Sequence, residues 1–305
     1  MVNYILYHNA DTDGHMALAV CAHWLREYDP DSEVHYIGAN YVPGWRFTPT
    51  TTQPYRLFIV DYHLSTDSMI DVLEDSNCEE VHWYDHHISG IREAQEDGLV
   101  SAAGESLHYK LKCRLSTHEA GCLNAWKALH GKENVPLAVH LASIYDTWNR
   151  KHSDWADALD FNLGVRTRFG RVEDLIDLIT FDGFTLDIIE EGQIIQDYLD
   201  IVKLAQAEKD SFLLDWRGLR FRAMNNSGNS LYLQEITKEK DIAGFLLFSF
   251  VPNCGWKISL FANEHFEGDV DLSRIAVSYG GGGHKGACGF YAKDLPFTLP
   301  TGGKQ

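Results

Sequence analysis

Residues 81–87 read Val-His-Trp-Tyr-Asp-His-His, a strand-like run that ends in one carboxylate and two imidazole side chains. Three other acidic sites stand in the same setting, each following or ending an apolar run: Asp11 with Asp13, Asp61, and Asp146. In open α/β sheets, ligands bind beyond the carboxyl ends of the strands. The run therefore predicts an α/β sheet with a metal site at one edge.

The first part of the chain alternates apolar strands with amphipathic helices, which is typical of a parallel sheet flanked by helices. Strands are expected at residues 3–7, 33–37, 55–61 and 81–84, helices at 14–28 and 65–74, and a long loop at 38–54. The overall prediction is an α/β fold with a parallel-sheet catalytic domain at 1–183, a connecting helix at 184–212 and a smaller α/β C-terminal domain at 213–305.

A helix is also expected at residues 116–130, because Ser116 and Glu119 have capping-box spacing and Gly131 follows the last apolar turn. Further helices are expected at 136–145, 154–163 and 172–180. In the last part, strands at 219–224, 242–251 and 256–261 precede a short helix at 271–279 and a tail from residue 296.

Composition excludes several classes of protein. The formal net charge of −18 over 305 residues argues against a long nucleic acid tract gripped along a basic groove. It leaves a small anionic substrate captured by metal ions. No apolar run approaches about 20 residues, so no membrane span is expected. The six cysteines are widely spaced and no signal peptide is evident, which predicts a cytoplasmic protein.

Each acidic site has a structural alternative. Asp11 and Asp13 can both turn toward one cation, or one of them can cap the following helix while Asp-Gly makes a turn. Asp61 can cap the sheet end or act as a ligand, and Asp146 can simply end a helix. Together, four acidic sites with histidines at two of them favour a dinuclear site. Carboxylates with some imidazole suit Mn²⁺, with Mg²⁺ as the alternative.

Asp85, His86 and His87 are expected to take different roles. Adjacent residues on a strand point to opposite faces, so one histidine is expected to bind metal while the other faces substrate. Asp85 can accept an N–H and so fix the orientation of a ring.

A glycine-rich run covers residues 280–286, Gly-Gly-Gly-Gly-His-Lys-Gly. Glycines let the backbone approach a ligand and present N–H groups to an anion. A flexible linker is the alternative, although structured segments flank the run. Substrate binding is therefore expected at Gly281, Gly282, Gly283 and His284.

These motifs resemble the DHH phosphoesterase superfamily, specifically members with the DHH-associated C-terminal domain such as the oligoribonucleases (nanoRNases). The resemblance rests on residues 8–14, Val60-Asp61, residues 85–87, Asp146 and residues 280–284, which span nearly the whole chain in the expected order. It implies one ion held by His8, Asp11 and Asp61, and a second ion held by Asp13, Asp61, His86 and Asp146. It also implies catalytic roles for His87, facing the phosphate, and Asp85, supporting it.

Two positions depart from the family pattern. The spacing from His8 to Asp11 is one residue shorter than the H-x-x-x-D-x-D of many members. Phe261 stands where many relatives have an arginine that contacts substrate phosphate, which leaves Arg166, Arg168, Arg220 and Arg222 as candidates.

The leading functional prediction is a Mn²⁺-dependent phosphodiesterase that hydrolyses short oligoribonucleotides to mononucleotides. The first alternative keeps this chemistry but acts on a cyclic or linear dinucleotide or a nucleotide 3′-phosphate. The second is a catalytically silent nucleotide sensor, against which the retention of every apparent ligand argues. The expected partners are short RNA or a nucleotide, and a fold of this kind can also form a homodimer.

Overall fold

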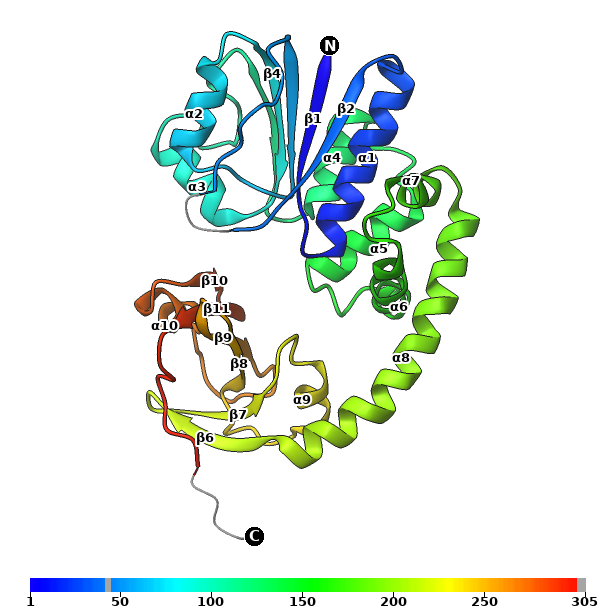
Figure 1. The fold of residues 1–305 in the computed structure, drawn as a ribbon. Coiled ribbons are helices and arrows are strands. Elements are labelled where there is room, and N and C mark those ends of the chain that lie inside the picture. Colours follow the sequence, from blue (N-terminus) through cyan, green and yellow to red (C-terminus); the bar gives the residue numbers. More distant parts are fainter. Residues whose placement is uncertain (42–44, 301–305) are drawn as a thin grey trace. The chain divides into compact units, whose positions relative to one another are not determined.

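In the computed structural model, which describes residues 1–41 and 45–300, the chain forms two compact units, Met1–Gln196 and Asp197–Gln305. Each unit has its own β-sheet (Figure 1). The predicted loop at 38–54 and the predicted tail extend partly beyond the described residues. The α/β fold class expected from the sequence is confirmed.

The first unit is built on a parallel sheet with the strand order β2-β1-β3-β4-β5. Its strands are β1 (Val2–His8), β2 (Glu33–Ala39), β3 (Tyr55–Val60), β4 (Cys78–Asp85) and β5 (Leu111–Leu115). From β1 the chain adds β2 on one side and then β3, β4 and β5 on the other, so the direction of strand addition reverses between β1 and β3. Because the strands are parallel, the carboxyl ends of β1 and β3 lie side by side at one edge of the sheet. In open sheets of this kind, that edge is where ligands bind.

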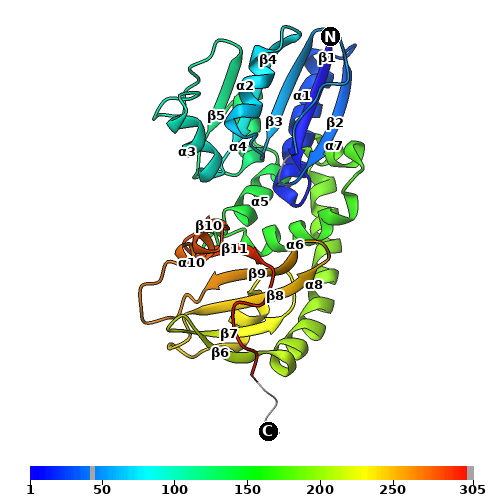
Figure 2. The ribbon, with the colours of Figure 1, turned by 60° about the vertical axis from the view of Figure 1, so that its left-hand side comes forward.

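Helices cover both faces of this sheet (Figure 2). They are α1 (Thr12–Tyr28), α2 (Thr66–Glu74), α3 (Ile88–Glu96), α4 (Gly121–Leu129), α5 (Leu137–Asp146), α6 (Trp155–Val165) and α7 (Val172–Thr180), with a 3₁₀ turn at Arg166–Arg168. Helices α1 and α4 pack on one face with α5, α6 and α7 around them, while α2 and α3 pack on the other.

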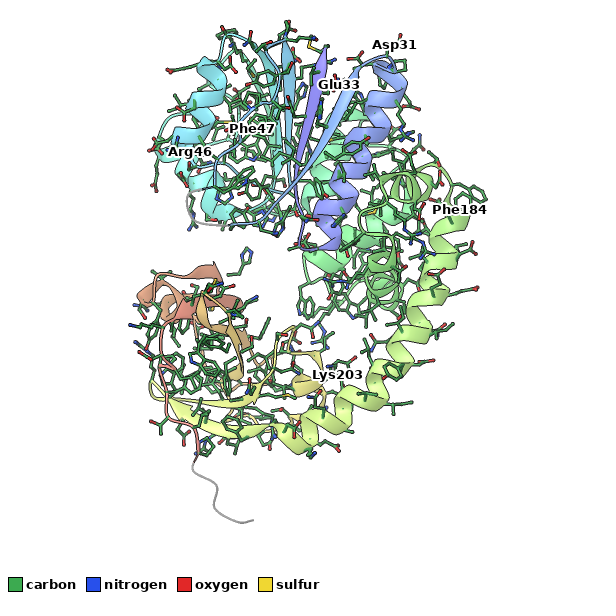
Figure 3. The ribbon with its side chains drawn as sticks, viewed as in Figure 1. Asp31, Glu33, Arg46, Phe47, Phe184 and Lys203 are labelled. Carbon is green, nitrogen blue, oxygen red and sulfur yellow. The ribbon has the colours of Figure 1, made fainter. Side chains whose placement is uncertain are left out.

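The alternation of side chains along the strands builds these two layers. On β3, Phe58 and Val60 pack toward α1, whereas Leu57 and Ile59 pack toward α2. Phe47, labelled in Figure 3, belongs to the α2 layer. A strand that is apolar on both faces is typical of a buried parallel sheet.

The predicted capping box at Ser116 is wrong. Helix α4 starts at Gly121, and the Glu119 carboxylate pairs with Lys127 at 2.6 Å and Arg114 at 3.3 Å. The N–H groups at the start of the helix instead donate to the carboxylate of Asp13. By contrast, the predicted Ser65 cap of α2 is confirmed, since its side chain accepts from the N–H of Ser68.

A long helix, α8 (Asp182–Asp210), contributes residues to both units. The second unit contains a six-stranded sheet of order β10-β11-β9-β8-β7-β6, in which β7 and β8 are parallel and the other neighbours antiparallel. Its remaining elements are β6 (Phe212–Trp216), β7 (Leu219–Asn225), α9 (Leu231–Ile236), β8 (Gly244–Val251), β9 (Gly255–Ala262), α10 (Ser273–Ser278), β10 (Gly282–His284) and β11 (Ala287–Ala292). Within the described part of the chain, no helix is long and apolar enough to cross a membrane.

Candidate metal centre

Acidic and imidazole side chains converge at the carboxyl edge of the parallel sheet. His8 ends β1, Asp61 follows β3, and Asp85 ends β4. Asp11 caps α1, and Asp146 is the last residue of α5. The sheet order places these segments side by side, so residues far apart in the sequence meet at one point.

One group consists of His8, Asp11 and Asp61, whose ligand atoms lie within 4.8 Å of one another. The His8 Nδ1 atom lies 3.0 Å from Oδ2 of Asp11 and 3.6 Å from Oδ2 of Asp61. Asp11 also caps α1, because its Oδ1 accepts the N–H of Gly14 at 3.0 Å. Capping and ligation are therefore compatible, since each uses a different oxygen of Asp11.

A second group consists of Asp13, His86 and Asp146, again within 4.8 Å of one another. The His86 Nε2 atom lies 3.3 Å from Oδ2 of Asp146 and 3.7 Å from Oδ2 of Asp13. It also lies 3.3 Å from Oδ1 of Asp61. Asp61 thus touches both groups, one through each of its oxygens.

The start of helix α4 holds Asp13 in place. The N–H of Gly121 donates to Oδ2 of Asp13 and the N–H of Cys122 donates to Oδ1, both at 2.7 Å. Backbone N–H groups at a helix start carry partial positive charge and favour an anion. These two bonds fix the carboxylate of Asp13 and satisfy the helix end that the sequence assigned to Ser116.

The backbone around Asp61 is shaped for close packing. Asp61 has a φ of 49°, a left-handed conformation that is uncommon outside glycine. A Cβ atom on Gly121 would lie 2.6 Å from the Cβ of Asp61, so only glycine lets α4 approach this closely. The carboxylate of Asp61 is 1% exposed, and neither oxygen has a hydrogen-bond partner among the described residues.

Burial and mutual repulsion shift the acidity of these groups. Burial, followed by the charges of Asp13 and Asp11, raises the pKa of Asp61 well above its usual range. Burial and Asp13 likewise raise the pKa of Asp146 to about 7. Burial lowers the pKa of His8, but Asp11 and Asp61 outweigh this and raise it to about 10. Carboxylates crowded in this way require positive charge nearby, which bound cations supply.

Asp85 orients the two histidines that follow it. Its Oδ1 accepts the N–H of His86 at 2.7 Å, and it lies 2.8 Å from Nδ1 of His87. Strand β4 ends at Asp85, so the alternation of a strand does not extend to the two histidines, and their separate roles stay predictions. Both rings turn toward Asp61, whose Oδ1 lies 3.3 Å from His86 and 3.7 Å from His87.

The sequence did not single out some neighbours of this cluster. The Tyr41 hydroxyl lies 2.9 Å from Nδ1 of His63, and the Tyr41 ring centroid is 5.8 Å from that of His87. The hydroxyl of Thr12 donates to Asn162 at 2.6 Å, tying the start of α1 to α6. His63 follows Asp61 by two residues, and this proximity was the only signal that pointed to it.

The glycine-rich run lies in the second unit and forms an ordered hairpin. Gly282–His284 pairs with β11, which excludes the flexible-linker alternative. Glycine is required at Gly283, where φ is 125°, and at Gly281, where a Cβ would lie 2.1 Å from the carbonyl oxygen of Gly289. Gly282 faces open space.

The arginine candidates differ in their surroundings. Arg168 pairs with Glu191 at 2.7 Å, Arg220 with Asp215 and Asp241, and Arg222 with Glu239. Arg166 donates to the carbonyl of Ala10 at 3.5 Å, in the loop that carries Asp11. Phe261 is half-buried and packs beside Phe245 and Leu247.

No protein-family model matches this sequence, and no curated protein matches it. Solved structures share its fold. The chain is similar over 95% of its length to the DHH domain of a member of a ribosomal protein family, covering 83% of that chain at 14% identity and a TM-score of 0.53. It is similar over 98% of its length to an exopolyphosphatase-related protein from Bacteroides fragilis, covering 88% of that chain at 13% identity and a TM-score of 0.50. At such identities the likeness concerns the fold.

Proposed function

We propose, from the premise that this chain has the fold of DHH-domain proteins, that it is a metal-dependent phosphodiesterase acting on short oligoribonucleotides. The observation that supports this most strongly is the carboxylate of Asp61. It is buried, has no hydrogen-bond partner among the described residues, and contacts both ligand groups. A buried charge without such a bond is costly unless it binds a cation.

The donor set fits two divalent ions. His8, Asp11 and Asp61 would hold one ion, and Asp13, His86 and Asp146 would hold the other, with Asp61 shared. Mixed carboxylate and imidazole ligands suit Mn²⁺ and also accept Mg²⁺. When bound, two such ions stabilise charge on a phosphoryl group and lower the pKa of a coordinated water. Mn²⁺ is the cofactor that we propose.

His87 and Asp85 act on the substrate side of this site. Asp85 fixes the ring of His87 through Nδ1, which leaves Nε2 free to meet a phosphate oxygen. Burial lowers the pKa of His87, but Asp85 outweighs this and raises it. A protonated His87 can donate a hydrogen bond to the phosphate and a proton to the departing oxygen.

The net charge of the chain supports a short substrate, and the glycine hairpin supplies further groups that we propose for binding it. A net charge of −18 does not favour a long polyanion. In the second unit, the backbone at Gly281, Gly282 and Gly283 and the ring of His284 are the groups that we propose for substrate binding. Gly282 is the informative position, since its open surroundings accept a methyl group without disturbing the hairpin.

A substrate panel tests the proposal. Purified protein with Mn²⁺ is incubated with a labelled RNA dinucleotide, a cyclic dinucleotide, a nucleotide 3′-phosphate and inorganic polyphosphate. We expect mononucleotide release from the RNA dinucleotide, its loss on chelation, and its recovery with added Mn²⁺. Exclusive turnover of another substrate would replace the substrate class, and turnover insensitive to chelation would overturn the metal chemistry.

A further inference from the structure

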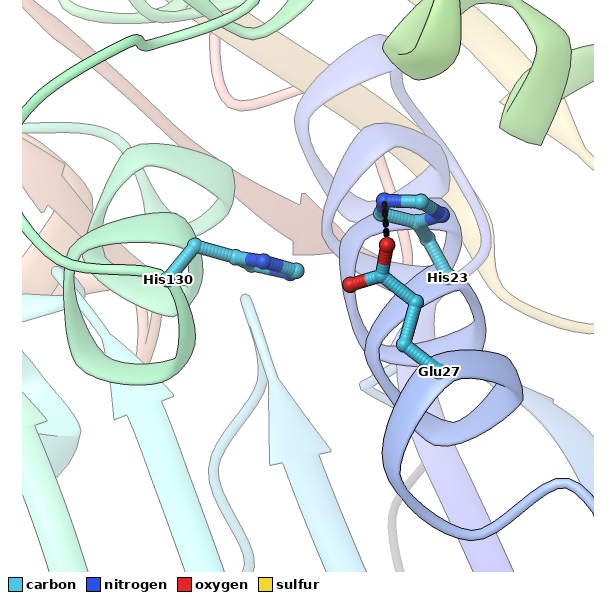
Figure 4. Close-up of side chains that lie close together, drawn as sticks. All are labelled: His23, Glu27 and His130. Carbon is cyan, nitrogen blue, oxygen red and sulfur yellow. Dashed lines mark ion pairs between the residues drawn. The ribbon is translucent and has the colours of Figure 1, made fainter.

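A second cluster of metal-ligating side chains lies on the same two helices, remote from the acidic cluster. His23 and Glu27 are one turn apart on α1, and His130 is the residue that caps the end of α4. Nε2 of His23 is 3.6 Å from Oε1 of Glu27, and the two imidazole rings lie 5.4 Å apart (Figure 4). Candidate ligand atoms of all three residues lie within 4.8 Å of one another.

The His130 side chain has one ring nitrogen without a hydrogen bond among the described residues. Its Nε2 is buried and has no hydrogen-bond partner within the described part of the chain. The ring is held by stacking on Trp126, with centroids 4.2 Å apart. An imidazole nitrogen without a hydrogen-bond partner is available as a metal ligand.

The two imidazole planes differ by only 15°, so the His23 ring must rotate before both rings can direct a nitrogen at one ion. Around a tetrahedral Zn²⁺ ion, nitrogen and oxygen ligands at about 2.0–2.2 Å lie about 3.3 Å from each other. The Glu27 side chain is 50% exposed and is free to close this difference, while His23 is 17% exposed. The exposed side leaves a route for the ion and a fourth position for water.

A second group of two histidines and one carboxylate has no such buried, unpartnered ring nitrogen among the described residues. His140, His152 and Asp154 also lie within 4.8 Å of one another. There, however, His140 Nε2 is 3.2 Å from Oδ2 of Asp154, and the N–H of Asp154 donates to Nδ1 of His152. These side chains are 31–40% exposed and already satisfy one another. The unpartnered nitrogen distinguishes the cluster at His130.

We propose that His23, Glu27 and His130 form a binding site for a Zn²⁺-class divalent ion that ties the end of α1 to the end of α4. Two imidazoles and one carboxylate favour such an ion over Mg²⁺ or Ca²⁺, which prefer oxygen ligands. His23 is twelve residues beyond Asp11, a rise of about 18 Å along α1. The site is therefore separate from the acidic cluster, which the starts of the same helices position.

Zinc stoichiometry tests this site. Full-length protein and variants are equilibrated with Zn²⁺ in the presence of Mn²⁺, and bound zinc is measured by elemental analysis. We expect the wild type to bind one equivalent more than His23→Ala or His130→Gln. His35→Ala is the matched control, because His35 pairs with Glu33 at 2.8 Å but belongs to none of the groups of three metal-ligating side chains among the described residues. Its zinc content is expected to equal that of the wild type.

A milder variant keeps the test valid if a histidine replacement fails to fold. Glu27→Gln changes a half-exposed side chain, so the fold is expected to persist. Its affinity for zinc at this site is expected to fall about tenfold or more, measured by calorimetry, and its thermal stabilisation by zinc is expected to shrink. Equal zinc content and equal affinity in the wild type, His23→Ala and Glu27→Gln would overturn the proposal.

Discussion

The two ends of the α1–α4 helix pair offer the same kinds of ligand in opposite surroundings. At the starts of these helices, Asp13 and Asp61 are buried and crowded. At their ends, Glu27 is half exposed and the buried Nε2 of His130 has no hydrogen-bond partner among the residues that the structure describes. We expect the first end to require cations to balance its charge, and the second to exchange its proposed ion with solvent. Burial, more than residue type, separates the two sites.

The largest expected effect comes from Asp61→Asn, which keeps the size of the side chain but removes its charge. Because Asp61 contacts both ligand groups, we expect turnover of the RNA dinucleotide to fall by more than the 10–100-fold typical of supporting residues. Steady-state kinetics with Mn²⁺ measures this. Asp71→Asn, which removes an exposed partner of Arg46, is the control. Undiminished turnover in Asp61→Asn would contradict the shared-ligand assignment.

A second prediction concerns His82, a buried imidazole with both nitrogens satisfied. It lies 2.8 Å from the Tyr84 hydroxyl and 3.1 Å from Glu80, and burial lowers its pKa to about 4. The folded state therefore binds its proton less readily than the unfolded chain, whose histidine pKa is 6.5. The free energy of unfolding therefore keeps its full value above pH 6.5. It falls by about 3 kcal/mol as the pH drops toward 4 and His82 must be protonated.

Denaturant unfolding of the wild type and His82→Gln across that pH range measures the contribution of His82. The variant is expected to lose less stability on acidification. His35→Gln, at a half-exposed imidazole, serves as the control and is expected to follow the wild type. Parallel pH profiles for the wild type and His82→Gln would show that this buried imidazole does not limit acid stability.

The smallest expected effect comes from Gly121→Ala, which adds a methyl group where α4 packs against Asp61. The added methyl would lie 2.6 Å from the Cβ of Asp61, so the helix start must shift. We expect the unfolding free energy to fall by about 1–3 kcal/mol. Gly286→Ala, whose methyl would make an ordinary 3.8 Å contact, is the stability control. Equal losses in both variants would mean that close packing at Asp61 is unimportant.

Local pattern predicted most of the first unit. Strands β1, β3 and β4 consist mainly of buried residues, and their runs of apolar and aromatic residues are visible in the sequence without tertiary context. The edge strand β5 was missed, because only Leu111 among its five residues is buried. The sequence predicts a connecting helix that runs to residue 212. In the structure, α8 ends at Asp210, and Phe212 pairs with Ala223 in the sheet of the second unit. An apolar residue at helical spacing does not reveal that a strand partner exists.

The sequence alone determined the α/β class and the acidic residues at successive strand ends, because apolar periodicity and chain order are local properties. Only the tertiary structure determined which contacts those residues make with one another. Asp13 caps a helix 108 residues away, Asp61 contacts both ligand groups, and His130 meets His23. These contacts depend on how helices pack on the sheet, and no short stretch of sequence encodes that packing.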